Sequence, residues 1–135
     1  MRTRTRLLVA GLVLAVGLLV AAASALAFIS GLTANSTATL SVNGTMATVS
    51  GTVQCDPGET VFVETRLRQV KGPSITEGFG ADVPVACNGT VQSWSTIVPT
   101  PTGAAWKTGK ATLGAFVEDQ DNFIEIQTQV RLTKS

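Results

Sequence analysis

Apolar and polar residues alternate along most of the chain, with the period of two that is typical of a β-strand buried on one face. The clearest example is TATLSVNGTMATVSGTVQC at residues 37–55, where two alternating runs flank Asn43 and Gly44. Because Asn-Gly tolerates the positive φ angles of a type I′ turn, this segment predicts a β-hairpin with a two-residue turn. In that register Leu40 faces Ala47, and the apolar side chains of both strands lie on one side of the sheet.

The inward side of the second strand continues to Cys55, where the strand meets the turn DPGE. The segment after the turn, VFVETRLRQ, predicts a half-buried antiparallel strand at residues 61–69. Its inward side chains are Val61, Val63 and Leu67, and its outward side chains are Phe62, Glu64, Arg66 and Arg68. A single exposed apolar residue such as Phe62 is common on protein surfaces, although the arginines beside it make a contact patch a second interpretation.

A second Asn-Gly pair, at residues 88–89, separates the run VPVAC from the run TVQSWSTIV. A two-residue turn there would pair these two runs and place Cys87 and Trp94 on one side of the sheet. Gln92 would then face inward as well, so a bulge or a longer loop is the alternative.

The last part of the chain predicts another hairpin, formed by ATLGAFVE at residues 111–118 and FIEIQTQVRL at residues 123–132. A shorter strand is predicted at SITEGF, and PTPTGAAWKTGK has the Pro and Gly content of a loop. The chain thus contains seven or eight short strands within about 100 residues, with turns every 8 to 12 residues or so. This pattern predicts an all-β fold, an antiparallel β-sandwich, with a small barrel as the alternative.

The beginning of the chain has the layout of an export signal. Three arginines, at positions 2, 4 and 6, precede an uncharged run at residues 7–29 that ends in small residues. The A-x-A pattern of a cleavage site fits best at residues 25–27. Since the uncharged run has 23 residues, enough to span a bilayer, an uncleaved membrane anchor is the alternative.

Cleavage after residue 27 divides the chain into a signal helix at residues 1–27, a short linker at residues 28–36 and a sandwich domain at residues 37–135. The domain is exported in either case, because the arginines keep the start of the chain on the inner side of the membrane. We therefore expect the protein to be secreted and extracellular, or anchored to the membrane through residues 1–27.

Export also changes the charge, because loss of residues 1–27 leaves seven basic against nine acidic residues, a formal charge of −2. A chain so close to neutrality does not point to nucleic acid as a partner. We expect contact with a membrane only through an uncleaved N-terminal segment. A protein or another component of the cell envelope is the expected partner.

Two cysteines in an exported chain indicate a disulfide bond between Cys55 and Cys87. Both are predicted to face inward at the end of a strand, next to a turn. A role as nucleophile or metal ligand is disfavoured, since the chain has no histidine to activate a thiol or complete a zinc site. Closing this loop is expected to stabilise the fold by roughly 3–4 kcal/mol.

Four segments, VSGTVQC, VFVETRLRQ, VACNGTVQSW and WKTGKATLGAFV, follow one another with turns and a Pro-rich loop between them. This arrangement resembles a family of small secreted bacterial proteins, mainly actinobacterial, that form an immunoglobulin-like domain of unknown function. The resemblance covers most of residues 36–133, and its main features are the two cysteines, Trp94 and the run from Trp106 to Ala111. It implies an immunoglobulin-like β-sandwich and no particular activity. At least three predicted strands follow Cys87, so the bridge connects other strands than in antibody domains.

The residue inventory disfavours an enzyme. Histidine and tyrosine are absent, no G-x-S-x-G or S-x-x-K motif occurs, and the spacing of the carboxylates shows no catalytic pair. We therefore expect a non-catalytic binding or structural module without a cofactor or metal. The alternatives are an exported protease inhibitor that presents the loop VPTPTGAAW, a small-ligand carrier and, less favoured, a hydrolase that uses carboxylates.

EDQDN at residues 118–122 gathers oxygen ligands in one predicted hairpin turn, as exported calcium sites do. The segment from Glu118 to Asn122 lacks the spacing and the glycine of an EF-hand loop. An ordinary acidic turn is therefore the favoured interpretation, and a calcium site is the alternative.

Overall fold

The computed structural model describes residues 28–101, 103–119 and 122–135, and the expected signal segment at residues 1–27 lies outside them. In these three ranges no helix is long and apolar enough to cross a membrane. The strands of the described residues are β1 (Ile29–Ala34), β2 (Thr37–Leu40), β3 (Met46–Cys55), β4 (Thr60–Lys71), β5 (Ser74–Phe79), β6 (Val83–Ala86), β7 (Val91–Pro99), β8 (Gly109–Glu118) and β9 (Phe123–Lys134). The fold is therefore all-β, as the alternating pattern predicts.

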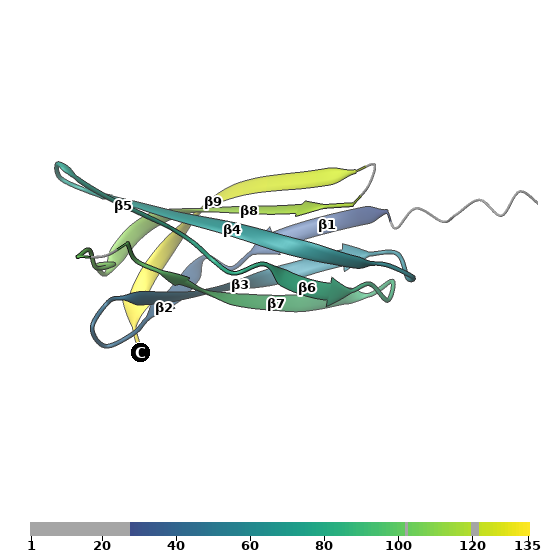
Figure 1. The fold of residues 1–135 in the computed structure, drawn as a ribbon, viewed down its shortest axis with the longest axis horizontal. Helices are drawn as coiled ribbons and strands as arrows, with labels where there is room; N and C mark the ends of the chain where they lie inside the picture. The colour runs from purple at the N-terminus through teal and green to yellow at the C-terminus, as the bar shows by residue number, and fades with distance from the viewer. Residues whose placement is uncertain (1–27, 102, 120–121) are drawn as a thin grey trace, which may run out of the picture.

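The strands form one hydrogen-bonded sheet in the order β1-β3-β2-β9-β8-β4-β5, with β7 also paired to β3 and β6 also paired to β4 (Figure 1). All pairings are antiparallel except that of β2 with β9, which is parallel. The short strand β2 thus joins the strands near the N-terminus to the C-terminal hairpin of β8 and β9.

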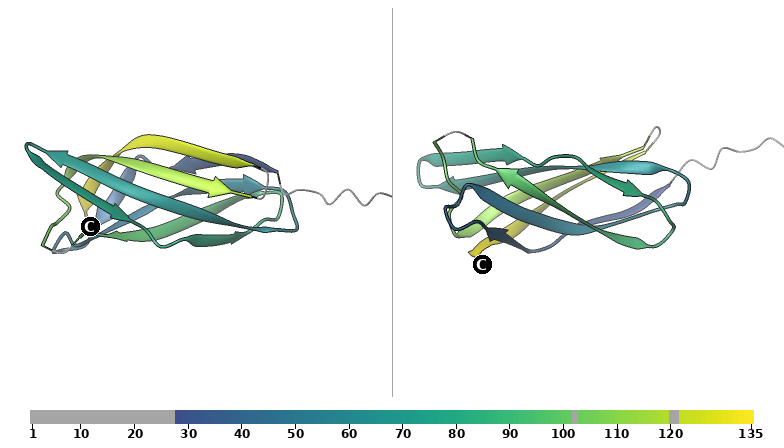
Figure 2. Two further views of the ribbon diagram at one scale, coloured as in Figure 1. Left: turned by 45° about the horizontal axis from the view of Figure 1, so that its top comes forward. Right: turned by 60° about the horizontal axis from the view of Figure 1, so that its bottom comes forward.

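The sheet folds over, so that β7, which pairs with β3, approaches β5 and also β6, which pairs with β4 (Figures 1 and 2). Side chains of β7 bridge this seam. The Thr96 hydroxyl donates to the carbonyl oxygen of Ala81 at 3.0 Å, and Gln92 Nε2 donates to that of Ala86 at 2.8 Å. The inward side chains of all parts of the sheet therefore share one core.

The core consists of aliphatic side chains, the disulfide and the two tryptophans. Trp94 and Trp106 are each 2% exposed, and their indole N–H groups donate to the carbonyl oxygens of Thr52 and Val98. Each large ring is thus buried without leaving its polar atom unpaired, which burial would otherwise penalise.

The first hairpin has the predicted register but another turn. Leu40 pairs with Ala47 as expected. Gly44 has a φ of 73°, whereas Asn43 does not have a positive φ, so the two cannot form a type I′ turn. The loop instead closes through a hydrogen bond from Gly44 N to Ser41 O at 2.9 Å, with Asn43 Oδ1 accepting from Thr45 N. Only the glycine adopts the left-handed conformation, which it enters without the steric cost of a Cβ.

The expected hairpin between VPVAC and TVQSWSTIV is wrong. Strand β6 pairs with β4, and β7 pairs with β3 instead. The Asn88–Gly89 turn carries the chain across the molecule, and Gly89 N donates to Cys55 O at 2.9 Å. Each of the two runs pairs with a long strand and not with the other run, since β3 has 10 residues and β4 has 12.

The expected linker at residues 28–36 contains strand β1, which raises the number of strands to nine among the described residues. Ile29 is 1% exposed and pairs with Cys55, and Leu32 pairs with Val53. The register shifts between Ile29 and Gly31. This irregularity interrupts the alternation, and the uncharged run at residues 7–29 overlaps the start of the strand, so the sequence gives no clear periodic signal there.

Candidate functional site

The two cysteines form the predicted disulfide. The Cys55–Cys87 bond has a Cα–Cα distance of 5.2 Å and joins the end of β3 to the residue after β6. Both residues are buried, so the bond is structural and not a reactive thiol site. A disulfide is consistent with an extracellular location.

None of the five phenylalanines is in the core, although phenylalanine usually belongs there. Four of them lie on the outward side of one part of the sheet, on four different strands: Phe62, Phe79, Phe116 and Phe123. Phe62, Phe79 and Phe123 are 50%, 63% and 65% exposed. The rings of Phe116 and Phe123 lie 5.8 Å apart. Exposed rings gathered on one surface indicate an interaction site more strongly than scattered ones.

We call this surface the aromatic face and define it by the outward residues of β9, β8, β4 and β5. Strand pairing arranges them in rows across the sheet. The rows are Phe123, Glu118 and Phe62; Glu125, Phe116 and Glu64; Gln127, Gly114, Arg66 and Phe79; and Gln129, Thr112, Arg68 and Glu77. Beyond them Arg131 pairs with Lys110, and Val70 pairs with Ile75.

Charge is distributed unevenly along these rows. The two rows nearest the β8–β9 turn contain the carboxylates Glu118, Glu125 and Glu64. The rows at the opposite end contain Arg68, Lys110 and Arg131, and the carboxylate of Glu77 there is engaged by two arginines. The aromatic face is therefore acidic at one end and basic at the other.

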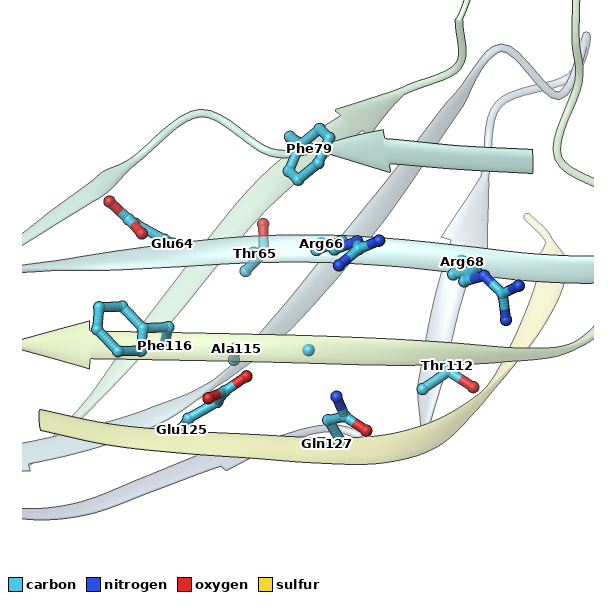
Figure 3. A pocket seen from close by; sticks show the side chains of 11 residues that line it. Glu64, Thr65, Arg66, Arg68, Phe79, Thr112, Ala115, Phe116, Glu125 and Gln127 are labelled. Atoms are coloured by element: carbon cyan, nitrogen blue, oxygen red, sulfur yellow. The ribbon is translucent and has the colours of Figure 1, made fainter. Parts of the chain in front are cut away.

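A hollow of about 430 Å³ lies at the centre of the aromatic face (Figure 3). Phe116 on β8 and Phe79 on β5 lie on opposite sides of strand β4, which supplies Glu64, Arg66 and Arg68. The residues that line the hollow are Glu64, Thr65, Arg66, Arg68, Phe79, Thr112, Gly114, Ala115, Phe116, Glu125 and Gln127. Gly114, which contributes no side chain to the third row, is one of these lining residues.

No packing constraint requires a glycine at position 114. A Cβ there would meet only Arg66 O, at 3.8 Å, and the backbone does not have a positive φ. Two other strand glycines differ, because a Cβ at Gly51 or Gly78 would collide with backbone oxygen at 1.9 or 2.3 Å. Gly31 is also uncrowded, but it lies at the register shift of β1. A glycine in a strand interior weakens the strand, and it often marks close approach by a ligand or another chain.

Both arginines beside the hollow contact the carboxylate of Glu77. Arg66 Nη2 lies 2.6 Å from Glu77 Oε2, and Arg68 Nε lies 3.8 Å from the same oxygen. The guanidinium carbon of Arg66 is 5.8 Å from the centre of the Phe79 ring. The ion pair and the cation–π contact limit the rotamers of Arg66 and Phe79, which lowers the entropy cost of binding there.

The opposite outward surface, on β3 and β7, has a different chemistry. It presents small hydroxyl residues and no aromatic ring among the described positions of these two strands' outward side, although Met46, Val91 and Ile97 are exposed there as well. The hydroxyls of Thr33 and Thr52 are 2.6 Å apart. Its outward positions include Thr48, Ser50, Thr52, Ser93 and Ser95. A substitution on this surface can therefore serve as a control for the same substitution on the aromatic face.

The acidic turn lies beside a shallow, open concavity of about 620 Å³ lined by Glu59, Thr60, Glu118 and Asp119. The turn closes through Asp119 N, which donates to Asn122 O at 2.8 Å. Among the described residues no three His, Cys, Asp or Glu side chains are grouped to hold a metal ion, and Asp121 lies outside those residues. The ordinary acidic turn stays the favoured interpretation.

The loop proposed for an inhibitor is tied to the body of the protein. Trp106 N donates to Gly44 O at 2.7 Å, and Thr100 N donates to Thr45 O at 2.9 Å. Gln69, which is 2% exposed, accepts from Lys107 N and donates to Lys107 O and Lys110 O. The sequence pattern did not single out Gln69, since it is a polar residue on the inward side of β4.

Sequence reasoning placed Phe62, Arg66 and Arg68 on one outward side but could not join them to Phe79 and Phe116. The central glycine was missed entirely. The sequence does contain one signal, a glycine between Leu113 and Ala115 in an otherwise regular strand. The alternation of apolar and polar residues gives such a glycine no special role. No family model matches this chain, and no curated protein matches it significantly.

Proposed function

We propose that this protein is a secreted or envelope-attached, non-catalytic binding module with an immunoglobulin-like β-sandwich fold, and that the aromatic face is its recognition surface. The disulfide supports an oxidising, extracellular setting. The main observation in favour of a recognition surface is the hollow over Gly114, which Phe79, Phe116 and Arg66 border.

The strand pairing supports the immunoglobulin-like assignment. Strands β9, β8, β4 and β5 follow the order of strands G, F, C and C′ in a variable-type domain, and β3 pairs with β7 as B pairs with E. Strands β1 and β2 occupy the place of a divided strand A. The disulfide differs from that of antibody domains, because Cys87 follows β6 and does not lie on β8.

The composition of the aromatic face suits a protein-like partner. Phenylalanine and arginine are enriched at the centres of protein interfaces, where they fill pockets behind a polar rim. Here the rings surround a central hollow, and Glu64, Glu125 and Gln127 supply polar groups around it. A partner that inserts a side chain over Gly114 would bury apolar area and displace water from the rings, which is favourable.

Two carboxylates, Glu64 and Glu125, line the same hollow and flank Phe116 in one row. This arrangement is the observation that favours a carboxylate hydrolase as a second candidate. Both side chains are exposed on an open surface. Nothing there would exclude water or hold a substrate in a fixed orientation, so a binding role is the better supported one.

The test compares the wild-type protein with two arginine variants. Gly114→Arg fills the hollow, and Thr48→Arg places the same side chain on the opposite outward surface. Each protein is immobilised and exposed to cell-envelope extract, and the retained proteins and glycans are quantified by mass spectrometry. We expect Gly114→Arg to lose components that wild type and Thr48→Arg both retain. Identical retention by all three proteins would exclude the aromatic face as the recognition surface.

A further inference from the structure

We propose that the partner recognised by the aromatic face is a second copy of this chain, bound face to face in a two-fold symmetric dimer. The proposal rests on the proposed function, because it uses the same recognition surface. Two-fold dimers are the commonest assemblies of soluble proteins, and they require a surface that is complementary to itself. The aromatic face meets that requirement in charge, in shape and in area.

For two copies to stack face to face, the two-fold axis must lie between the sheets. An axis parallel to the strands would place each row over its own copy. Glu64 and Glu125 would then face each other, which repels. An axis perpendicular to the strands, through the row of Gly114 and Arg66, reverses the order of the rows instead. The charge distribution therefore selects one of the two orientations.

In that orientation Glu64 and Glu118 face basic residues, whereas Glu125 faces the uncharged Gln129. On β4, residues 64 and 68 are equally far from Arg66, so Glu64 of each copy faces Arg68 of the other. On β8, residues 118 and 110 are equally far from Gly114, so Glu118 faces Lys110. The symmetry doubles both pairs, which gives four opposite-charge pairs around the centre.

Apolar groups also meet complementary ones. Phe62 of one copy faces Val70 of the other, and both are exposed in the single chain, at 50% and 52%. The two Gly114 residues meet on the axis and merge their hollows. Phe116 of each copy faces the small residue Thr112 of the other and lies beside this shared space. At Phe116 and Thr112 a large side chain thus opposes a small one, which favours close packing.

The row on the axis faces the same row of the other copy, so any net charge on it would repel its own copy, and the row must be neutral. Arg66 satisfies this condition, since its guanidinium is 2.6 Å from the Glu77 carboxylate and lies over Phe79. Phe79 is 63% exposed in the single chain, and the two copies of Phe79 bury each other on the axis. Gln127, the outward residue of β9 in this row, adds no charge.

The area is sufficient for a weak dimer. The face is four strands wide, at about 4.8 Å per strand, and about eight residues long, at about 3.4 Å per residue. Its area is therefore roughly 500 Å² per copy. The total of about 1,000 Å² is near the lower limit for a specific interface and in the range of reversible complexes. We therefore expect dimers at high local concentration, as on a cell surface, and monomers in dilute solution.

The test measures sedimentation of the disulfide-bonded protein from about 1 µM to about 1 mM, a range that brackets weak dimers. Glu64→Arg and Arg68→Glu each create a like-charge pair across the axis. Each variant alone should raise the dimer dissociation constant more than about tenfold. An equimolar mixture restores opposite charges, so a heterodimer should form within about threefold of the wild-type affinity.

A second exchange, Glu118→Lys with Lys110→Glu, repeats the test without touching Glu77, and Thr48→Arg is the control that should dimerise normally. A wild-type protein that stays monomeric, or a mixture that fails to restore the dimer, overturns the proposal. If the wild type is monomeric but Gly114→Arg still abolishes retention of an envelope component, only the second-copy proposal fails. If the dimer forms as described but Gly114→Arg and Thr48→Arg retain the same envelope components as the wild type, the proposed binding of envelope components by the aromatic face fails instead.

Discussion

Gly114→Thr should make the single chain more stable while weakening its association. Position 114 is in the middle of β8, paired with β4 on one side and β9 on the other. A Cβ has room there, with its nearest contact at 3.8 Å, and the backbone is not in the left-handed region. Threonine therefore adds β-propensity without a clash, and it fills the hollow that a partner would use.

The gain in stability has two sources. Replacing a strand-interior glycine reduces the entropy lost on folding, worth about 0.5–1 kcal/mol. Threonine also favours the strand conformation, on a scale that spans about 1 kcal/mol between residues. We expect the free energy of unfolding to rise by about 1 kcal/mol, which raises Tm by about 4–8 °C for a domain of this size. Association should weaken at least about fivefold, because overpacking at a contact costs about 1–3 kcal/mol.

Urea denaturation at low protein concentration gives the free energy of unfolding of the single chain, and calorimetry gives Tm. The slope of the free energy against urea should stay unchanged, since the folded and unfolded states expose the same surface. Gly78→Ala is the control within the same sheet. Its Cβ would lie 2.3 Å from Pro99 O, so it should destabilise the protein by about 1–3 kcal/mol.

Two results would refute this reasoning. If Gly114→Thr destabilises the chain as Gly78→Ala does, the glycine is a structural requirement and says nothing about a partner. If the variant is more stable but associates and retains partners as the wild type does, the hollow is not part of the recognition surface.

Three further changes test the scaffold. Replacing Cys55 and Cys87 with alanine should lower the free energy of unfolding by about 3–4 kcal/mol, measured in guanidinium chloride, and an unaffected midpoint would contradict a stabilising bridge. Gln69→Leu should cost about 2–3 kcal/mol in urea, because it removes the side-chain partner of the backbone groups of Lys107 and Lys110. Gln127→Leu, on the outward side of β9, is the matched control and should change little. Millimolar calcium should leave Tm unchanged if residues 118–122 form an ordinary turn, so a clear rise in a thermal-shift titration would establish a cation site instead.

Local pattern predicted much of the fold. Alternation placed Leu40 opposite Ala47 and paired the last two strands, because a period of two fixes which side of a strand is buried. It also placed both cysteines inward, where they form their bond. Pattern failed where the partner of a strand lies far along the chain. VPVAC pairs with β4 and not with the run that follows it, since the length and position of available edges decide pairing.

The sequence by itself determined an all-β chain with one disulfide, since alternation and cysteine count are properties of neighbouring residues or of composition. Only the tertiary structure decided that Phe62, Phe79 and Phe116 share one surface, with a hollow lined by Phe79 and Phe116. These residues are on three strands whose order in the sheet differs from their order in the chain. Which outward residues become neighbours depends on pairing across the sheet, and this pairing is set by the packing of the whole core.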